Sequence, residues 1–259
     1  MALKRAFMVV ASVSLVTLVS PQAALAAPAD PVAVLQKLLA SGHGVTISGT
    51  AKTWIGDDSS KPASKLSVKG VLAFDKGKLA AGEVTRVTAS GNKFRFRVVG
   101  GVTYGSGGAW SDMLPAGKTW ARSPILKFQP YELSEQNINI FEPLTLRKIL
   151  TTTKSKTPHQ AVRGVPATRY AGVITAKALC TVSAACRKGF GKSGDTRIAW
   201  QLLLDGRGRV VRLATAWTRA KNSAAGVPGG GSEVNTYYSG WGAKVVIKAP
   251  PAGQVAKVS

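Results

Sequence analysis

The stretch that decides the fold is "TRIAWQLLLDGRGRVVRLATAW", residues 196–217. Its first arm alternates apolar with other residues, the apolar positions being Ile198, Trp200, Leu202 and Leu204. Asp205-Gly206 then supplies a dipeptide favoured in tight hairpin turns. The second arm returns with Val211, Leu213 and Trp217. A period of two on both sides of a turn predicts a β-hairpin with one apolar face.

The same period recurs on both sides of this hairpin. Towards the N-terminus it is carried by Val45 and Ile47, by Leu66, Val68, Leu72 and Phe74, and by Phe94, Phe96 and Val98. Arg95 and Arg97 lie between the last three and face the other way. Further strands are expected in "ATRYAGVIT" and "EVNTYYSGWGAKVVIKAP". Strands with one apolar and one polar face are typical of an antiparallel sheet covered on one side.

Two short helices interrupt the strands. In "ADPVAVLQKLLASG", Asp30 is the expected N-cap, Pro31 opens the helix and Gly42 stops it. In "FEPLTLRKILTTT", Pro143 opens a second helix, on which Leu146, Ile149 and Leu150 share a face. The predicted fold class is α+β, mainly β: an open, curved antiparallel sheet, or half-barrel, with a few helices packed on its concave face.

The first 26 residues read as a cleaved export signal. Lys4 and Arg5 precede an apolar run from Ala6 to Val19, and Ala24 to Ala26 form a small-residue cleavage site. The run is about 14 residues, whereas roughly 20 are needed to span a bilayer. We therefore expect residues 1–26 to be removed and residues 27–259 to form a single domain, a monomer that is secreted or otherwise outside the cytoplasm.

The chain is strongly basic, with a net charge of +23. Residues 143–259 hold 19 Lys and Arg against 3 Asp and Glu, whereas residues 27–142 hold 14 against 9. This half contains the bases that we single out as candidate contacts with an anionic surface: Arg147, Lys148, Lys154, Lys156, Arg187, Lys188 and Lys192. They form either a solvated face or a binding surface for anionic membrane or acidic wall polymer. Export argues against nucleic acid as the partner.

The two cysteines, Cys180 and Cys186, are six positions apart. In an oxidising compartment the simplest interpretation is a local disulfide. No cysteine lies near the cleavage site, so a lipid anchor is not expected. The chain has only two histidines, which argues against a zinc site, and no metal or cofactor is expected.

Catalytic patterns are weak. His43 and His159 lie in apparent loops, and no G-x-S-x-G motif accompanies them. "GKS" at 191–193 lacks the earlier glycine of a phosphate-binding loop, since that position is Cys186. Carboxylates such as Asp57 and Asp75 are scattered along the chain, so an enzyme stays a possible hypothesis. A protein without catalytic activity is the preferred one.

The large apolar residues of the strands admit two interpretations. They can fill a core with their own neighbours, or they can line an apolar pocket that two short helices do not fill. The candidate ligand-cavity residues are Phe74, Phe94, Phe96, Ile198, Trp200, Leu202, Leu213 and Trp217.

The order of five motifs resembles a known family. They are "YGSGGAW", "LPAGKTWAR", "GVPATRYAG", "WQLLLDGRGRVVRL" and "TYYSGWGAKVVIKAPPAGQV". From about Val45 to Val255, this order is similar to that of the exported actinobacterial branch of the LolA/LppX-like lipoprotein-carrier superfamily. The resemblance implies a half-barrel around helices, with a cavity that in relatives holds acyl chains. It also implies that the segment from "YSGWG" to "APPAGQV" is the closing strand at one edge.

Two hypotheses without catalytic activity come before that of an enzyme. The first is a secreted, non-enzymatic protein that holds a lipid or acylated ligand in an apolar cavity, with its basic half on anionic head groups. The second is an interaction module with a filled core, whose basic face binds anionic wall polymer or a membrane surface.

Overall fold

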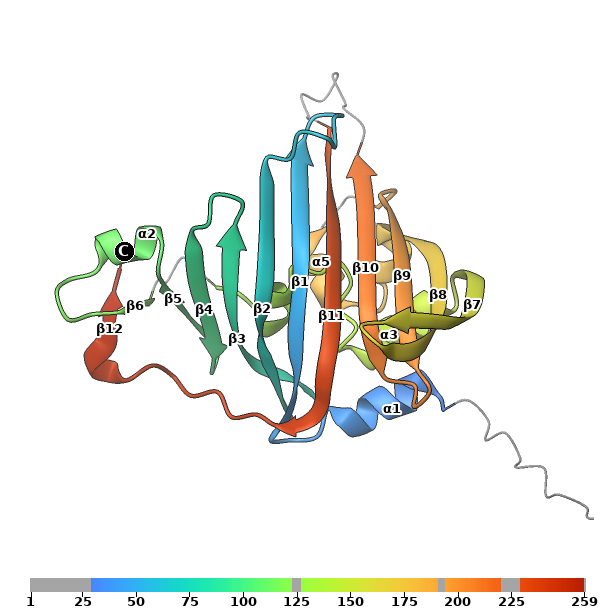
Figure 1. The fold of residues 1–259 in the computed structure, drawn as a ribbon, viewed down its shortest axis with the longest axis horizontal. Helices are drawn as coiled ribbons and strands as arrows, with labels where there is room; N and C mark the ends of the chain where they lie inside the picture. The colour runs from blue at the N-terminus through green and yellow to red at the C-terminus, as the bar shows by residue number, and fades with distance from the viewer. Residues whose placement is uncertain (1–28, 123–126, 191–193, 220–228, 259) are drawn as a thin grey trace, which may run out of the picture.

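The computed structural model describes residues 29–122, 127–190, 194–219 and 229–258. The expected signal segment and Lys192 lie outside these residues. The described residues form one open sheet of twelve strands in the order β12-β6-β5-β4-β3-β2-β1-β11-β10-β9-β8-β7. All neighbouring pairs are antiparallel except β12 and β6. Figure 1 shows the sheet curving, with the helices mainly on one side of it. The predicted fold class is confirmed.

The strands follow the alternation of the sequence. Their bounds are β1 His43–Ile55, β2 Ser64–Asp75, β3 Lys78–Thr88, β4 Lys93–Val99, β5 Val102–Ser106, β6 Trp120–Arg122, β7 Thr153–Val162, β8 Val165–Thr175, β9 Arg197–Asp205, β10 Val210–Arg219, β11 Gly230–Lys244 and β12 Val255–Lys257. The helical elements are α1 Pro31–Leu38, α2 Ala109–Met113, η1 Pro130–Ser134, α3 Pro143–Leu150, α4 Ala176–Cys180, α5 Ala184–Gly189 and η3 Ala252–Gln254.

Both predicted helices are present. Asp30 caps α1, because its carboxylate accepts a hydrogen bond of 3.0 Å from the backbone N–H of Val32. Pro143 opens α3, which buries Leu146 and Ile149. Burial of these apolar faces against the strands holds both helices to the sheet, since helices of eight residues are marginal alone.

The 196–217 hairpin forms as predicted, with one difference of phase. The pairing of β9 with β10 shifts register between Val210 and Arg212. Val210 and Leu213 therefore pack in the main core, whereas Val211 joins a small cluster on the other side of the sheet. The predicted common face of Val211 and Leu213 is wrong, because a bulge inserts one residue and reverses the alternation before it.

The C-terminal tail is not a single edge strand. β11 lies inside the sheet between β1 and β10, so the segment around Trp241 does not close an edge as the resemblance implied. The chain leaves the sheet after Lys244, and residues 245–254 lead to β12, which pairs in parallel with β6 (Figure 1). β12, and not β11, is the edge strand at that end of the sheet.

Candidate functional site

The two faces of the sheet have different surroundings. One, here called the covered face, bears η1, α3 and the loop between them. The other, here called the open face, carries residues that alternate with those of the core, such as Lys52, Gln201 and Glu233. Paired residues of antiparallel strands point to the same side. The strand register therefore assigns whole rows of side chains to each face.

The covered face is filled by the chain itself. Six of the eight candidate cavity residues are buried in the main core: Phe74, Phe96, Ile198, Trp200, Leu202 and Leu213. Phe94 and Trp217 are partly buried against it. The segment before α3 packs on these residues through Leu133, Ile138, Ile140 and Phe141, each at most 4% exposed. This segment occupies space that the cavity hypothesis reserved for a guest, and a ligand-lining role of the eight residues stays a prediction.

A large hollow lies over β1, β2, β8, β9, β10 and β11, with a volume of about 670 Å³. Two neighbouring rows of the open face form its floor. The first row is Ala171, Gln201, Ala214, Asn235 and Thr50. The second contains Ala199, Ala216, Glu233, Lys52 and Lys65. We call this hollow the open-face groove.

Alanine side chains make the groove. Ala171, Ala199, Ala214 and Ala216 occupy positions where most strands carry longer side chains. Because nothing extends beyond the Cβ atoms of these four residues, the floor is recessed and apolar where they lie. Lys52 lies at the rim with its Nζ 3.7 Å from Glu233 Oε2 and 5.5 Å from the centre of the Trp54 ring. Lys65 lines the same end without an ion pair among the described residues.

The turn between β7 and β8 contacts the open face at the other end. Arg163 and Gly164 both have positive φ, as a two-residue turn of this kind requires. The Arg163 guanidinium donates a 2.8 Å hydrogen bond to Ser48 Oγ and lies 3.8 Å from the centre of the Tyr237 ring. These partners are on β1 and β11, several strands away from β8. The β7–β8 turn therefore folds over the open face at this end.

A second, smaller hollow of about 330 Å³ lies on the covered face between η1, α5 and the end of β10. Trp217 and Phe190 line it with rings 5.8 Å apart. Trp217 Nε1 donates to Asn137 Oδ1 at 3.1 Å, and Asn137 Nδ2 donates to Thr215 Oγ1 at 3.0 Å. The segment that fills the core is thus hydrogen-bonded to the strands as well as packed on them.

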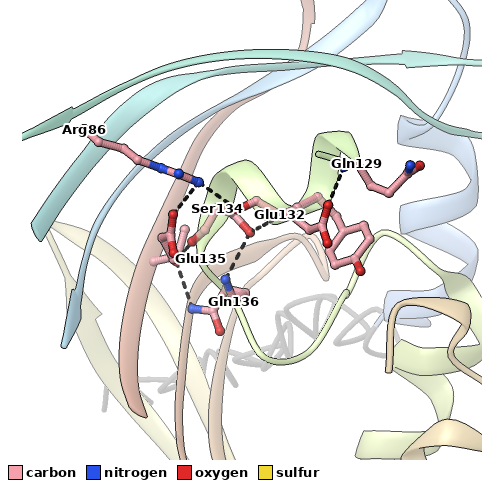
Figure 2. Close-up of polar contacts among 8 residues, drawn as sticks. Arg86, Gln129, Glu132, Ser134, Glu135 and Gln136 are labelled. Carbon is pink, nitrogen blue, oxygen red and sulfur yellow. Dashed lines mark hydrogen bonds and ion pairs between the residues drawn. The ribbon is translucent and has the colours of Figure 1, made fainter. Parts of the chain in front are cut away.

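A partly buried ion pair lies beside this hollow. Figure 2 shows Arg86 of β3 reaching towards Glu135 and the end of η1. Its guanidinium also donates to Glu132 O at 3.1 Å and lies 4.7 Å from the Phe96 ring centre. Burial raises the pKa of Glu135, and the Arg86 charge opposes this only in part. Burial likewise lowers the pKa of Arg86, while the Glu135 charge raises it.

The neighbouring Tyr131 is also affected. Burial first, and then the charges of Glu132 and Glu142, raise its pKa to about 12. Its hydroxyl is therefore neutral at physiological pH. The hydrogen bonds of Arg86, Asn137 and Trp217 around this second hollow indicate a structural joint between η1 and the sheet.

The predicted anionic-surface residues lie on three elements. Arg147 and Lys148 are in the last turn of α3, and Lys154 and Lys156 follow in β7. Arg187 and Lys188 end α5, where they have partners within the protein. Arg187 donates to Cys180 O at 2.7 Å, and Lys188 Nζ is 3.7 Å from Glu132 Oε1. Contact with an anionic surface stays a prediction for this set.

Cys180 and Cys186 form the expected disulfide, which joins α4 to α5. In the described part of the chain, no group of three His, Cys, Asp or Glu residues is arranged to hold a metal ion. None of the helices in the described ranges combines the length and the apolar character needed to cross a membrane.

Sequence reasoning missed the groove-forming alanines. Their signal is visible in "IAWQ" and "ATAW", where alanine alternates with buried residues on strands that pair directly. Alanine is compatible with either face and with any element, so the pattern acquires meaning only when the strand register brings the four positions together.

No protein-family model and no curated protein matches the chain. Among solved structures it is similar to the lipoprotein LppX of Mycobacterium tuberculosis, with 16% identity, 84% of this chain and 96% of that chain covered, and a TM-score of 0.44. LprF of Mycobacterium bovis is similar with 16% identity, coverage of 86% and 99%, and a TM-score of 0.40. A DUF1329 family protein from Desulfovibrio piger has 14% identity, coverage of 82% and 89%, and a TM-score of 0.26. The resemblance to LppX-like proteins noted in the sequence thus recurs among solved structures.

Proposed function

We propose that this is a non-enzymatic, extracytoplasmic binding protein that holds the acyl part of a lipid or lipidated ligand in the open-face groove. The observation that carries the proposal is the recessed alanine floor. Its volume of about 670 Å³ falls in the range of roughly 300–1,000 Å³ usual for sites that bind small molecules. The disulfide supports a location outside the cytoplasm, where such bonds persist.

The shape and chemistry of the groove suit a chain better than a compact polar molecule. Its floor crosses β8, β9 and β10 on four alanine side chains, with Gln201 between Ala171 and Ala214 and the charged Lys52, Lys65 and Glu233 at one end. Each CH₂ group that becomes fully buried contributes about 0.8 kcal/mol, and a ligand in an open groove gains a fraction of that. Affinity should therefore rise with chain length, by at most about fourfold per added CH₂.

The test is uptake of a fluorescent 16-carbon fatty acid by the delipidated protein and by groove-filled variants. Ala214→Phe and Ala216→Phe place a ring on the floor, and each should raise the Kd about tenfold or more. Ala243→Phe is the matched control, because Ala243 is exposed on β11 outside the groove. It should bind as the unchanged protein does.

Two outcomes reject the proposal. No uptake by the delipidated protein rejects acyl binding, and equal uptake by the floor variants rejects this groove as the site. The interaction-module hypothesis gives a different pattern: binding to anionic vesicles or wall polymer that weakens steeply with salt and does not depend on acyl chain length.

A further inference from the structure

Three arginines gather at the end of the groove near the turn between β7 and β8. Arg169 of β8 and Arg212 of β10 lie in one row of the open face, each paired with Leu203 of β9 between them. Neighbouring strands are about 4.8 Å apart, so their Cα atoms are separated by roughly 10 Å. Arg163 reaches the same row from the turn, since it contacts Tyr237, the partner of Arg212 on β11.

This row adjoins the groove directly. Arg169 is two residues from Ala171, and Arg212 is two residues from Ala214, a spacing of about 7 Å along a strand. Arg212 Nε donates a 2.7 Å hydrogen bond to Asn235 Oδ1, and Asn235 itself lines the groove. A ligand lying on the alanine floor would thus have its end beside these guanidinium groups.

The positive charge of the row is not neutralised within the described residues. None of the seven ion pairs there involves Arg163, Arg169 or Arg212. The partners of these arginines are neutral: Ser48, Tyr237, Asn235 and Thr157. The nearby Asp205, which ends β9, is buried and bonded to Arg209 at 2.7 Å.

One donor also lacks a partner. Arg169 Nε is buried and makes no hydrogen bond in the described structure, while its Nη2 donates to Thr157 Oγ1 at 3.2 Å. Buried donors are nearly always satisfied. Uncompensated guanidinium groups with a free donor are suited to an oxyanion, because the planar fork of arginine binds phosphate oxygens in pairs.

We propose that Arg163, Arg169 and Arg212 form a phosphate-binding subsite at one end of the open-face groove, so that the preferred ligand is an acyl lipid with a phosphate head. This inference rests on the proposed function for the acyl part. The same chemistry would also bind a small phosphate ester without acyl chains.

The experiment compares three soluble probes by titration calorimetry: dioctanoyl phosphatidic acid, dioctanoylglycerol with the same chains, and glycerol 3-phosphate. The full chain without its export segment should bind the phosphatidic acid about tenfold or more tightly than the diacylglycerol. Arg169→Gln/Arg212→Gln should bring this ratio near one. Arg122→Gln, which removes an exposed charge from β6 near the opposite edge of the sheet, should leave the ratio unchanged.

The outcomes of this experiment distinguish the phosphate-binding subsite from the proposed function. Equal affinity of the unchanged protein for both acyl probes, or an unchanged ratio in the double variant, overturns the subsite and leaves the groove standing. Binding of glycerol 3-phosphate without either acyl probe supports the subsite and rejects the proposed function. If the glutamine variant does not fold, Arg169→Lys/Arg212→Lys replaces it. The lysine variant should have an affinity ratio between one and that of the unchanged protein, since lysine keeps the charge but cannot bind two phosphate oxygens at once.

Discussion

Gly172 shows how much depends on single small residues in this sheet. It lies in β8 beside Ala171, and a Cβ atom there would meet the Thr152 carbonyl oxygen at 2.2 Å and the Trp200 ring at 2.6 Å. The same ring donates a 3.1 Å hydrogen bond to Thr152 Oγ1. Gly172 thus lets β8 approach the segment after α3 and leaves room for the Trp200 ring.

We expect Gly172→Ala to lower the free energy of unfolding by about 1–3 kcal/mol, because neither the carbonyl nor the packed ring can move freely. Gly206→Ala is the control, since a Cβ at Gly206 would meet nothing within 4 Å. Its effect should stay within about 0.5 kcal/mol. Urea unfolding of both variants checks this, and equal stability would contradict the close approach at Gly172.

At the same scale, Glu135 gives a pH dependence whose sign is set by burial. Its pKa is raised in the folded protein above the ordinary value of 4.5. The folded state therefore binds a proton more tightly than the unfolded chain, and this contribution to stability is lost as pH rises through the folded pKa. Relative to Glu135→Gln, the unchanged protein should gain stability as pH falls from neutral to about 4.5.

Urea unfolding at a series of pH values measures this difference. At neutral pH, Glu135→Gln should not lower the free energy of unfolding, because Gln resembles the protonated acid and burial disfavours the ionised form more than the Arg86 charge stabilises it. A free energy of unfolding that rises with pH in the unchanged protein, relative to the Gln variant, would contradict the assignment of the sign.

At the scale of elements, the alternation of apolar residues was sufficient to predict the strands. It was not always sufficient to predict which face of the sheet a side chain lies on. "RIAWQLLLD" alternates strictly at first and forms β9, while the bulge after Val210 reverses the phase at the start of β10. Such a bulge follows from pairing with a neighbour, and a single strand's sequence does not specify it. The groove could not be predicted from the sequence for the same reason. Its floor forms only when the register of β8, β9, β10, β11 and β1 brings their side chains together.

The helices illustrate the same limit. α1 and α3 carry caps and apolar faces and were predicted, whereas α4 and α5 are only five and six residues long. Elements so short lack a helical period, and tertiary contacts decide them. The cysteine pair was readable because spacing and compartment alone suggest a local disulfide.

That disulfide should stabilise the α4–α5 corner modestly. Its loop is short, so we expect Cys180→Ser/Cys186→Ser to lose about 2 kcal/mol of unfolding free energy, as the entropy of a small closed loop suggests. Thermal unfolding checks this loss of stability. The double variant is compared with the unchanged protein, which is measured both in the presence and in the absence of a reductant. An unchanged Tm would show that packing, including that of the buried Leu179, holds the corner without the disulfide.

At the scale of the whole molecule, the C-terminal segment joins distant parts of the sheet. After β11 it leads to the edge, where β12 pairs with β6 and the Arg97 guanidinium donates to Lys248 O at 2.8 Å. Lys118 Nζ donates to Gly253 O at 2.8 Å nearby. These bonds fasten the C-terminal segment to β4 and to the residues just before β6.

Removal of residues 249–259 should therefore loosen one end of the sheet and spare the other. Hydrogen exchange should become faster in β6, whose backbone the loss of β12 exposes, and in its neighbour β5, and stay nearly constant in β8, β9 and β10. A uniform increase across the sheet would contradict this division and make the tail a requirement for global stability.

The most direct measurement of the central claim is photolabelling with a phospholipid that carries a diazirine in its acyl chain, followed by mapping of the labelled peptides. Binding in the open-face groove predicts label around Ala199, Ala214 and Ala216, and little in residues 133–141. Label concentrated in residues 133–141 and α3 would contradict this placement. It would mean that the segment filling the covered face moves aside to admit the ligand.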